Sequence, residues 1–221
     1  MKLWEKKGSD INTQIEKFTV GRDPEFDMVL AKYDVQGSIA HAKMLESVNM
    51  LSHEDADAIL KELKNIETEI NEGSFQIEEG VEDIHSQIEL NLTKKIGDAG
   101  KKIHSGRSRN DQIAVDIKLF LRAEIKELKS LVKNLFDLLI SLSDQYKDDL
   151  LPGYTHLQIA MPSSFGLWFS AYAESLVDDL EMLSAAYQVV NKNPLGSGAG
   201  YGSSFPLNRK LTTELLEFNS L

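Results

Sequence analysis

The sequence predicts an all-α protein, in which a small N-terminal helical domain (residues 1–105) precedes the first part of a long central helical bundle (residues 106–221). Three observations support this prediction. Two long stretches repeat apolar residues every three or four positions, several shorter stretches before them have helix start and stop residues, and no stretch has a strong strand pattern. With 42% apolar residues among 221, the chain is able to bury a sizeable core.

The first hundred residues contain three shorter predicted helices. Ser52 followed three positions later by Asp55 is typical of a helix start, and Gly73 is typical of a helix end. The three helices cover residues 26–49, 52–72 and 80–96. This pattern indicates a separate small helical domain.

The longest predicted helix covers about residues 107–149. Its apolar positions are spaced by 4, 4, 3, 4, 3, 4 and 3 residues at Ile117, Leu121, Ile125, Leu128, Val132, Leu135, Leu139 and Leu142. Such a helix is roughly 60 Å long, whereas a compact chain of this length has a radius of gyration of only ~17 Å. Further apolar residues widen the stripe beyond a two-helix seam at Phe120, Leu131, Phe136, Leu138 and Ile140. We expect a rod or a bundle completed by other chains, and the wide stripe favours the bundle and hence an oligomer.

A second long helix follows the breakers at residues 150–153 and Pro162. Its apolar positions are Phe165, Phe169, Tyr172, Leu176, Leu180, Leu183, Tyr187 and Val190. Residues 191–193 and Pro194 end it. The glycine-rich stretch that follows, at residues 195–206, fits neither a Rossmann nor a P-loop fingerprint, and we expect a closely packed loop with unusual backbone angles.

Composition excludes several classes of protein. The chain has no cysteine, which excludes disulfides, a thiol nucleophile, iron–sulfur clusters and cysteine-bound zinc. A net charge of −11 argues against general nucleic-acid binding. The first residues lack the apolar core of a signal peptide, and no apolar run approaches the ~18 residues of a membrane span, so we expect a cytoplasmic protein without membrane contact. None of the five histidines pairs at the spacing of a helical metal motif, and we expect no metal site.

Residues 103–112, IHSGRSRNDQ, are the most unusual stretch of the chain. Ser108 and Asp111 stand in the register of a helix cap, directly before the long helix. A helix N-terminus attracts carboxylates or phosphates, and Arg107 and Arg109 add bidentate donors. The alternative is an ordinary cap with surface arginines.

Two further stretches have residues suited to chemistry. Residues 153–162, GYTHLQIAMP, place Thr155, His156 and Gln158 in a turn between the long helices, and histidine is suited to acid–base work near neutral pH. Residues 82–85, EDIH, place Asp83 and His85 near a helix start. A structural turn and a solvated acidic helix end are the alternatives for these two stretches.

These three stretches, with DVQGSIAHAKML (residues 34–45) and PLGSGAGYGSSFPLNR (residues 194–209), resemble the argininosuccinate lyase family of the fumarase/aspartase superfamily. The resemblance runs from Leu3-Trp4 to the last residues. It implies a mostly α-helical homotetramer with a long central bundle and active sites assembled from three subunits. The implied reaction, in arginine biosynthesis, is reversible cleavage of argininosuccinate to arginine and fumarate without metal or organic cofactor.

The resemblance also implies roles for individual residues. Arg109 and Asn110 would hold the succinyl carboxylates, and His156 would take part in proton transfer. The implied substrate-contacting residues are Thr155, Asp83 and His85. These residue types fit the reaction. β-Elimination next to a carboxylate leaves a dianion, which needs fixed hydrogen-bond donors, and the departing guanidine nitrogen needs a general acid.

The sequence departs from the family pattern in several places. Family chains are longer, and their signature loop with the proton-abstracting serine lies beyond Leu221, so we expect an N-terminal portion that is inactive alone. Gly21 stands near the position where the family has a serine. Met161 occupies a position that is usually glutamine in the family, and Ser105 one that is usually threonine. These departures leave two alternatives: a lyase for a related succinyl substrate, and a non-catalytic structural protein on the same scaffold.

Overall fold

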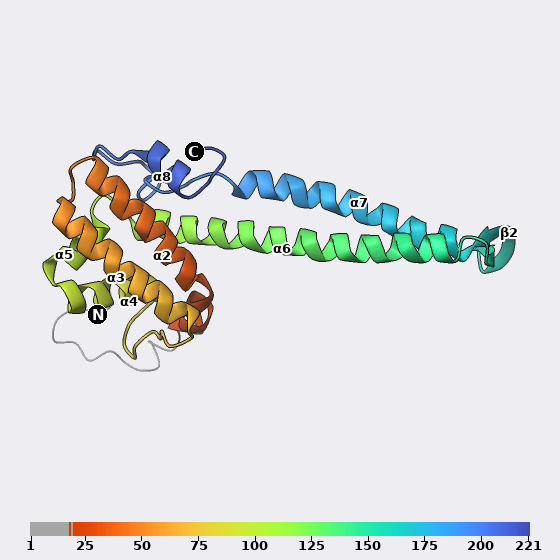
Figure 1. The fold of residues 1–221 in the computed structure, drawn as a ribbon, viewed down its shortest axis with the longest axis horizontal. Helices are drawn as coiled ribbons and strands as arrows, with labels where there is room; N and C mark the ends of the chain where they lie inside the picture. The colour runs from red at the N-terminus through yellow and green to blue at the C-terminus, as the bar shows by residue number, and fades with distance from the viewer. Residues whose placement is uncertain (1–17, 19) are drawn as a thin grey trace. The chain divides into compact units, whose positions relative to one another are not determined.

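The computed structural model of the chain describes residue 18 and residues 20–221 (Figure 1). Leu3-Trp4 and part of the altered motif at residues 17–22 lie outside the described residues. The chain divides into two compact units, one up to Phe120 together with Asn191–Leu221, and the other Leu121–Val190. The predicted domain boundary after residue 105 stays a prediction.

The all-α prediction is confirmed, because helices dominate the described residues and the sheet among them has only two strands. The elements are α2 (Asp23–Ser47), α3 (His53–Asn71), α4 (Ile84–Ile96), α5 (Asp98–Lys101), the 3-10 helix η1 (Lys102–His104), α6 (Arg109–Gln145), β1 (Leu150–Thr155), β2 (Gln158–Ser164), α7 (Phe165–Val190) and α8 (Arg209–Leu215). No helix among these residues is both long enough and apolar enough to cross a membrane.

The helix starts in the first unit follow their capping residues. The Ser52 hydroxyl oxygen accepts the backbone N–H of Asp55 at 3.2 Å, as predicted. The helix predicted from residue 80 instead begins at Ile84. Asp83 is its cap, since its carboxylate accepts the backbone N–H of Ser86 at 2.8 Å. The prediction placed the helix start four residues too early, because it did not identify Asp83 as the cap.

The core of the first unit lies between α2, α3 and α4. Its fully buried side chains include Val35, Leu45, Ile59, Leu63, Ile84, Leu92 and Ile103. Gly100 lets α5 approach the backbone of α4, because a Cβ there would lie 2.6 Å from the carbonyl carbon of Leu92. This packing holds the start of α4 and the loop before α6 against α2.

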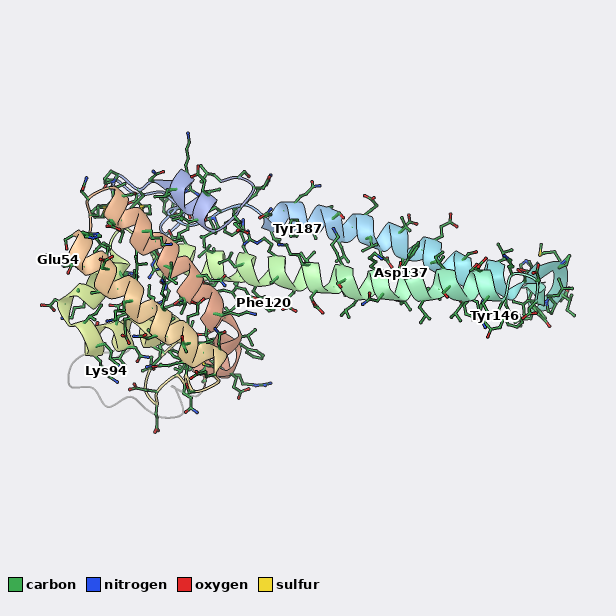
Figure 2. The ribbon with its side chains drawn as sticks, in the orientation of Figure 1. Glu54, Lys94, Phe120, Asp137, Tyr146 and Tyr187 are labelled. Carbon is green, nitrogen blue, oxygen red and sulfur yellow. The ribbon has the colours of Figure 1, made fainter. Side chains whose placement is uncertain are left out.

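In the second unit, α6 and α7 lie side by side and run in opposite directions (Figures 1 and 2). The ring of Tyr146 lies 6.3 Å from that of Phe169 near one end of the pair, and the Lys126 ammonium lies 5.9 Å from the Tyr187 ring near the other. Gly166 brings the start of α7 close to the end of α6. Both predicted long helices are therefore present, and α7 ends before residues 191–193 as expected.

Much of the apolar stripe on these two helices is exposed in the single chain. Large apolar side chains on the two helices, within this stripe and next to it, have exposed fractions between 45% and 76%, among them Leu128, Leu131, Leu135, Leu138, Trp168, Tyr172, Val177 and Met182. Exposed apolar surface of this extent is typical of an interaction site. The expected oligomer stays a prediction.

A β-hairpin joins the two long helices, where the sequence predicted only a turn. β1 pairs antiparallel with β2, with Leu150 opposite Ser164 and Thr155 opposite Gln158. The expectation of no strand was wrong here, because the hairpin is short, contains prolines in both strands and turns without glycine. The residues at its tip, His156 and Leu157, have φ of 49° and 63°.

Candidate active site

Two of the sequence stretches meet in the first unit, at the N-termini of α4 and α6. The Arg109 guanidinium lies 2.8 Å from the Asp83 carboxylate and 3.4 Å from that of Glu82. It also donates to the Ser86 hydroxyl at 2.9 Å. The structure thus brings Asp83 and Arg109, both predicted site residues, into direct contact.

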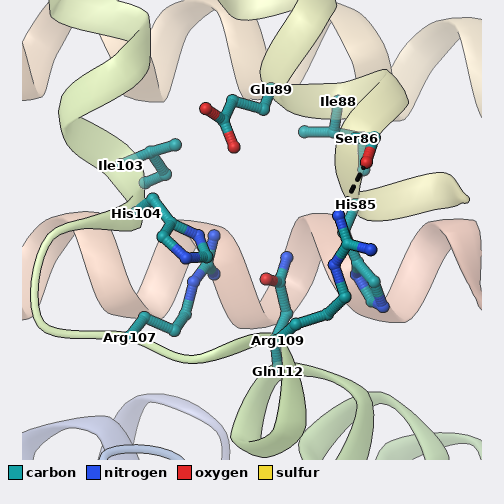
Figure 3. A pocket seen from close by; sticks show the side chains of 9 residues that line it. All are labelled: His85, Ser86, Ile88, Glu89, Ile103, His104, Arg107, Arg109 and Gln112. Carbon is teal, nitrogen blue, oxygen red and sulfur yellow. Dashed lines mark hydrogen bonds between the residues drawn. The ribbon is translucent and has the colours of Figure 1, made fainter. Parts of the chain in front are cut away.

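A pocket opens beside this contact (Figure 3). Its lining residues are His85, Ser86, Ile88, Glu89, Ile103, His104, Arg107, Arg109 and Gln112. The guanidinium groups of Arg107 and Arg109 and the carboxylate of Glu89 are its charged lining groups, and guanidinium groups bind carboxylates and phosphates. Arg107 donates to the Ser38 hydroxyl at 3.0 Å, and its Nε has no hydrogen-bond partner among the described residues.

The helix cap predicted at the start of α6 is present in part. The Ser108 backbone N–H donates to Asp111 Oδ1 at 2.9 Å, and the Asn110 N–H donates to the Ser108 hydroxyl at 3.3 Å. Asn110 itself is exposed and is not among the residues that line the pocket. The structure therefore does not bring Asn110 into the pocket that Arg109 lines.

The carboxylate of Asp111 also holds the glycine-rich loop. Its Oδ2 accepts the backbone N–H groups of Gly196 and Gly198, at 2.8 and 2.9 Å. Both glycines have positive φ, and a Cβ on Gly196 would lie 2.8 Å from the Arg209 side chain. The expected unusual backbone angles are confirmed, because Gly200 and Gly202 have positive φ as well. The expected close packing holds only for residues 195–198, at the start of α6, since residues 199–206 are exposed.

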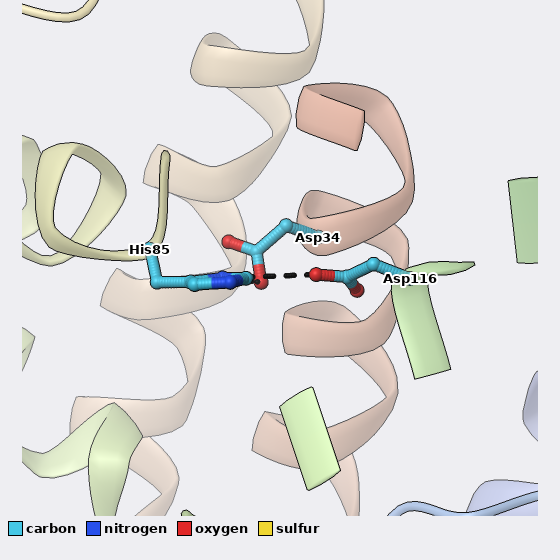
Figure 4. A group of neighbouring side chains, drawn as sticks. All are labelled: Asp34, His85 and Asp116. Atoms are coloured by element: carbon cyan, nitrogen blue, oxygen red, sulfur yellow. Dashed lines mark hydrogen bonds and ion pairs between the residues drawn. The ribbon is translucent and has the colours of Figure 1, made fainter. Parts of the chain in front are cut away.

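His85 is held in a buried polar cluster that we call the His85 cluster, formed with Asp34 and Asp116 (Figure 4). His85 Nδ1 lies 3.1 Å from Asp34 Oδ1 and 3.6 Å from Asp116 Oδ2. Gln112 donates to Asp34 Oδ1 at 2.6 Å. One ligand atom from each of the three residues lies within 4.8 Å of the others, so the donor types of a metal site are present where the sequence spacing indicated none.

The two carboxyl groups of the His85 cluster differ in acidity. Burial and the neighbouring charge of Asp34 raise the pKa of Asp116 well above its ordinary value. Burial also acts to raise the pKa of Asp34, but His85, Arg107 and Gln112 outweigh it and hold that pKa below its ordinary value. The pKa values of the two carboxyl groups are therefore shifted in opposite directions.

Thr155 and His156 lie in the second unit, at the tip of the hairpin. Both are exposed, and His156 has a left-handed backbone conformation. Two-residue hairpin turns with positive φ at both positions favour Asn-Gly, so His-Leu is strained there. Strain of this kind is typical of functional positions, and it presents the imidazole at the tip of the hairpin.

Sequence reasoning missed several polar residues of the site. Gln112 and Ser86 line the pocket, and Asp34 and Asp116 hold His85. The one signal available was an acidic residue between apolar or aromatic neighbours: Asp34 stands between Tyr33 and Val35, and Asp116 between Val115 and Ile117. Of the substituted family positions, Ser105 accepts a hydrogen bond from His41 through its carbonyl oxygen, and Met161 is exposed on β2.

Comparison with known proteins places these features in a family. The family model described as "Lyase" matches residues 15–221. Argininosuccinate lyase of Parabacteroides distasonis is 63% identical over 220 residues, which cover 100% of this chain and 49% of that protein. The corresponding enzyme of Desulfitobacterium hafniense is 45% identical over 196 residues, covering 89% and 42%. This chain thus spans about half the length of the curated relatives it matches.

Two solved structures have folds similar to that of this chain. A variant of EDDS lyase with bound fumarate matches with a TM-score of 0.79 and 27% identity, covering 97% of this chain and 42% of that one. The β-carboxy-cis,cis-muconate cycloisomerase of Acinetobacter calcoaceticus matches with a TM-score of 0.71 and 19% identity, covering 88% and 47%. The second likeness concerns the fold alone.

Proposed function

This chain belongs to the lyase family, and on that premise we propose that the protein containing it is an argininosuccinate lyase, which cleaves argininosuccinate to arginine and fumarate. The observation that carries the proposal is the contact of Arg109 with Asp83 beside the pocket that Arg107 and Arg109 line. This contact brings together residues 82–85 and residues 103–112, two of the stretches that resemble the argininosuccinate lyase family. The 63% identity to argininosuccinate lyase of Parabacteroides distasonis supports the same reaction.

In this proposal the pocket binds the succinyl end of the substrate. Arg109 donates to a substrate carboxylate from the first turn of α6, where the free N–H groups of the helix add positive potential. Asn110, the next residue of α6, adds a second donor, His85 lines the pocket, and Asp83 holds Arg109 beside it. These groups are fixed before the substrate arrives, so they stabilise the negative charge that develops when the proton next to the carboxylate is removed.

We assign the other half of the chemistry to the hairpin tip. Thr155 contacts the substrate, and His156 supplies the proton that the departing guanidine nitrogen needs. The left-handed backbone of His156 supports a functional role, because strained conformations of this kind are typical of functional positions.

We further propose that the active site takes these two halves from different copies in a homotetramer. Arg109 is the first residue of α6, and His156 lies eleven positions after its last residue, Gln145. At 1.5 Å per residue, the 37 residues of α6 span about 55 Å. The exposed apolar stripes on α6 and α7 provide the surface for such an assembly. A cytoplasmic location stays a prediction.

Fumarate release tests the function. The full-length protein is offered argininosuccinate, adenylosuccinate and aspartate separately, and fumarate is followed by its ultraviolet absorbance. We expect release from argininosuccinate alone, with one arginine formed for each fumarate. Release from a different succinyl compound would transfer the proposal to that substrate, an alternative motivated by Met161 and Ser105. A folded oligomer that neither binds nor cleaves any of them would contradict enzymatic function and favour a structural role.

A further inference from the structure

Two carboxyl groups face each other in the His85 cluster, in a part of the protein closed to solvent. The side chains of Asp34, from α2, and Asp116, from α6, are each 0% exposed, and that of His85 is 6% exposed. Figure 4 shows the three groups in one row. Two carboxyl groups this close in a buried site do not both ionise unless a cation lies between them. Without a cation, one of the two keeps its proton.

The hydrogen bonds show where such a proton is needed. Asp34 Oδ1 already accepts from Gln112 and faces His85 Nδ1. Asp34 Oδ2 and both oxygens of Asp116 are buried without any hydrogen-bond partner among the described residues. Unsatisfied buried acceptors are costly, and a proton on Asp116 would turn one of them into a donor for Asp34.

The charges around Asp116 favour the neutral form of this residue. Its charged neighbours are Asp34 and Asp27 from α2 and Arg107 from the loop before α6, together with His85 from α4. Asp34 has two direct hydrogen-bonding partners, His85 and Gln112. Arg107 instead donates to Ser38, and among the ion pairs of the described residues none joins it to Asp34 or Asp116. A metal ion would have to compete with Gln112 for Asp34 Oδ1 and would lie in the field of the Arg107 guanidinium.

We infer that Asp116 is a neutral carboxylic acid that donates a hydrogen bond to Asp34, and that this pair positions His85 with its Nδ1–H toward Asp34. His85 Nε2 is then the nitrogen left for the pocket that His85 lines. Asp34 and Asp116 are positioning residues in this arrangement. Its consequence for turnover rests on the proposed function, but the proton on Asp116 does not.

Infrared spectroscopy of the full-length protein labelled with carbon-13 aspartate tests the proton directly. At about pH 8, where ordinary aspartates with a pKa near 4 are ionised, we expect the C=O stretch of a protonated aspartic acid. The band disappears in Asp116→Asn and persists in the control Asp98→Asn, which changes an exposed carboxylate. A wild-type protein without the band, or one that holds a divalent metal ion in each chain, would overturn the inference. The wild-type measurement decides even if Asp116→Asn fails to fold.

Kinetics test the positioning role. Asparagine at 116 keeps a neutral donor, whereas Asp116→Leu removes it, so kcat is expected to fall by about tenfold or more in the leucine variant and to be largely rescued by asparagine. Equal loss in both variants, with both folded, would contradict the role. A protein that cleaves argininosuccinate but lacks the infrared band contradicts only this inference. A protein with the band that cleaves no argininosuccinate contradicts only the proposed function.

Discussion

The Asp111 carboxylate accepts the backbone N–H of Gly196 at 2.8 Å, and so joins residues that are 85 positions apart in the sequence. The same side chain accepts from Ser108 in the cap of α6 and from Gly198 in the glycine-rich loop. It is 1% exposed. One buried carboxylate therefore holds the glycine-rich loop against the end of α6 that begins with Arg109.

Asp111→Ala is expected to destabilise the fold. The variant removes three hydrogen bonds to a charged acceptor and leaves buried N–H groups unpaired, which predicts a loss of about 3 kcal/mol or more in the free energy of unfolding. Denaturant unfolding of the full-length protein measures it. Asp98→Ala, at an exposed position, is the matched control and is expected to stay near the wild type. Equal stability of the two variants would show that Asp111 does not anchor the loop.

Gly166→Ala is expected to destabilise the pair of long helices. A Cβ at this position would lie 2.6 Å from the Ser143 carbonyl oxygen and 2.6 Å from Lys147 Cα. Overpacking against backbone costs about 1–3 kcal/mol, since neither neighbour is able to move as a side chain does. Thermal unfolding of Gly166→Ala is compared with that of Ala171→Ser, an exposed change on the same helix. A variant as stable as this control would contradict the close approach.

His41 is expected to limit stability in acid. Burial beside Arg107 lowers its pKa from 6.5 to about 3, and its Nε2 donates to the Ser105 carbonyl. Between these two values the unfolded chain binds the proton and the folded chain does not, so stability falls as pH decreases below about 6.5. The loss is about 2 kcal/mol at pH 5. His41→Gln keeps a donor for Ser105 without titrating, and its stability should vary less over this range. An unchanged acid profile would exclude His41 as the cause.

Substitutions at the two halves of the proposed site are expected to have different kinetic effects. His156→Asn removes the acid but retains a residue that tolerates positive φ, and kcat should fall by about 10²–10⁴-fold with the oligomeric state unchanged. Arg109→Ala should weaken binding of the succinyl end by about 1.5–3 kcal/mol and raise KM. Steady-state kinetics with argininosuccinate separate the two. Wild-type turnover in His156→Asn would rule out its role as the acid.

The sequence predicted the features that depend on neighbours along the chain. Apolar spacing indicated α6 and α7, and Ser52 and Ser108 indicated helix starts, because a helix period and a cap involve residues only a few positions apart. The hairpin was missed because its tip, His156 and Leu157, lacks the residues that usually mark such a turn.

The parts of the site that join distant segments were not predictable in this way. Asp34, His85 and Asp116 come from three helices, and their polar character alone did not indicate that they meet. The contact of Asp111 with Gly196 likewise depends on how the loop packs after α7. Of the residues named from resemblance to the family, His85 and Arg109 line the pocket and Asp83 contacts Arg109, whereas Thr155 and His156 lie at the hairpin tip. Their roles stay predictions.

Mixed oligomers test most directly whether one copy supplies Arg109 and another supplies His156 to a lyase site. Arg109→Ala and His156→Asn are each produced alone and then co-expressed, and fumarate release is measured with argininosuccinate at a concentration below the KM of Arg109→Ala. Sites shared between copies predict that co-expression restores release well above either variant alone, because some sites then contain neither substitution. A mixed oligomer that is no more active than the average of the two variants would contradict the shared site.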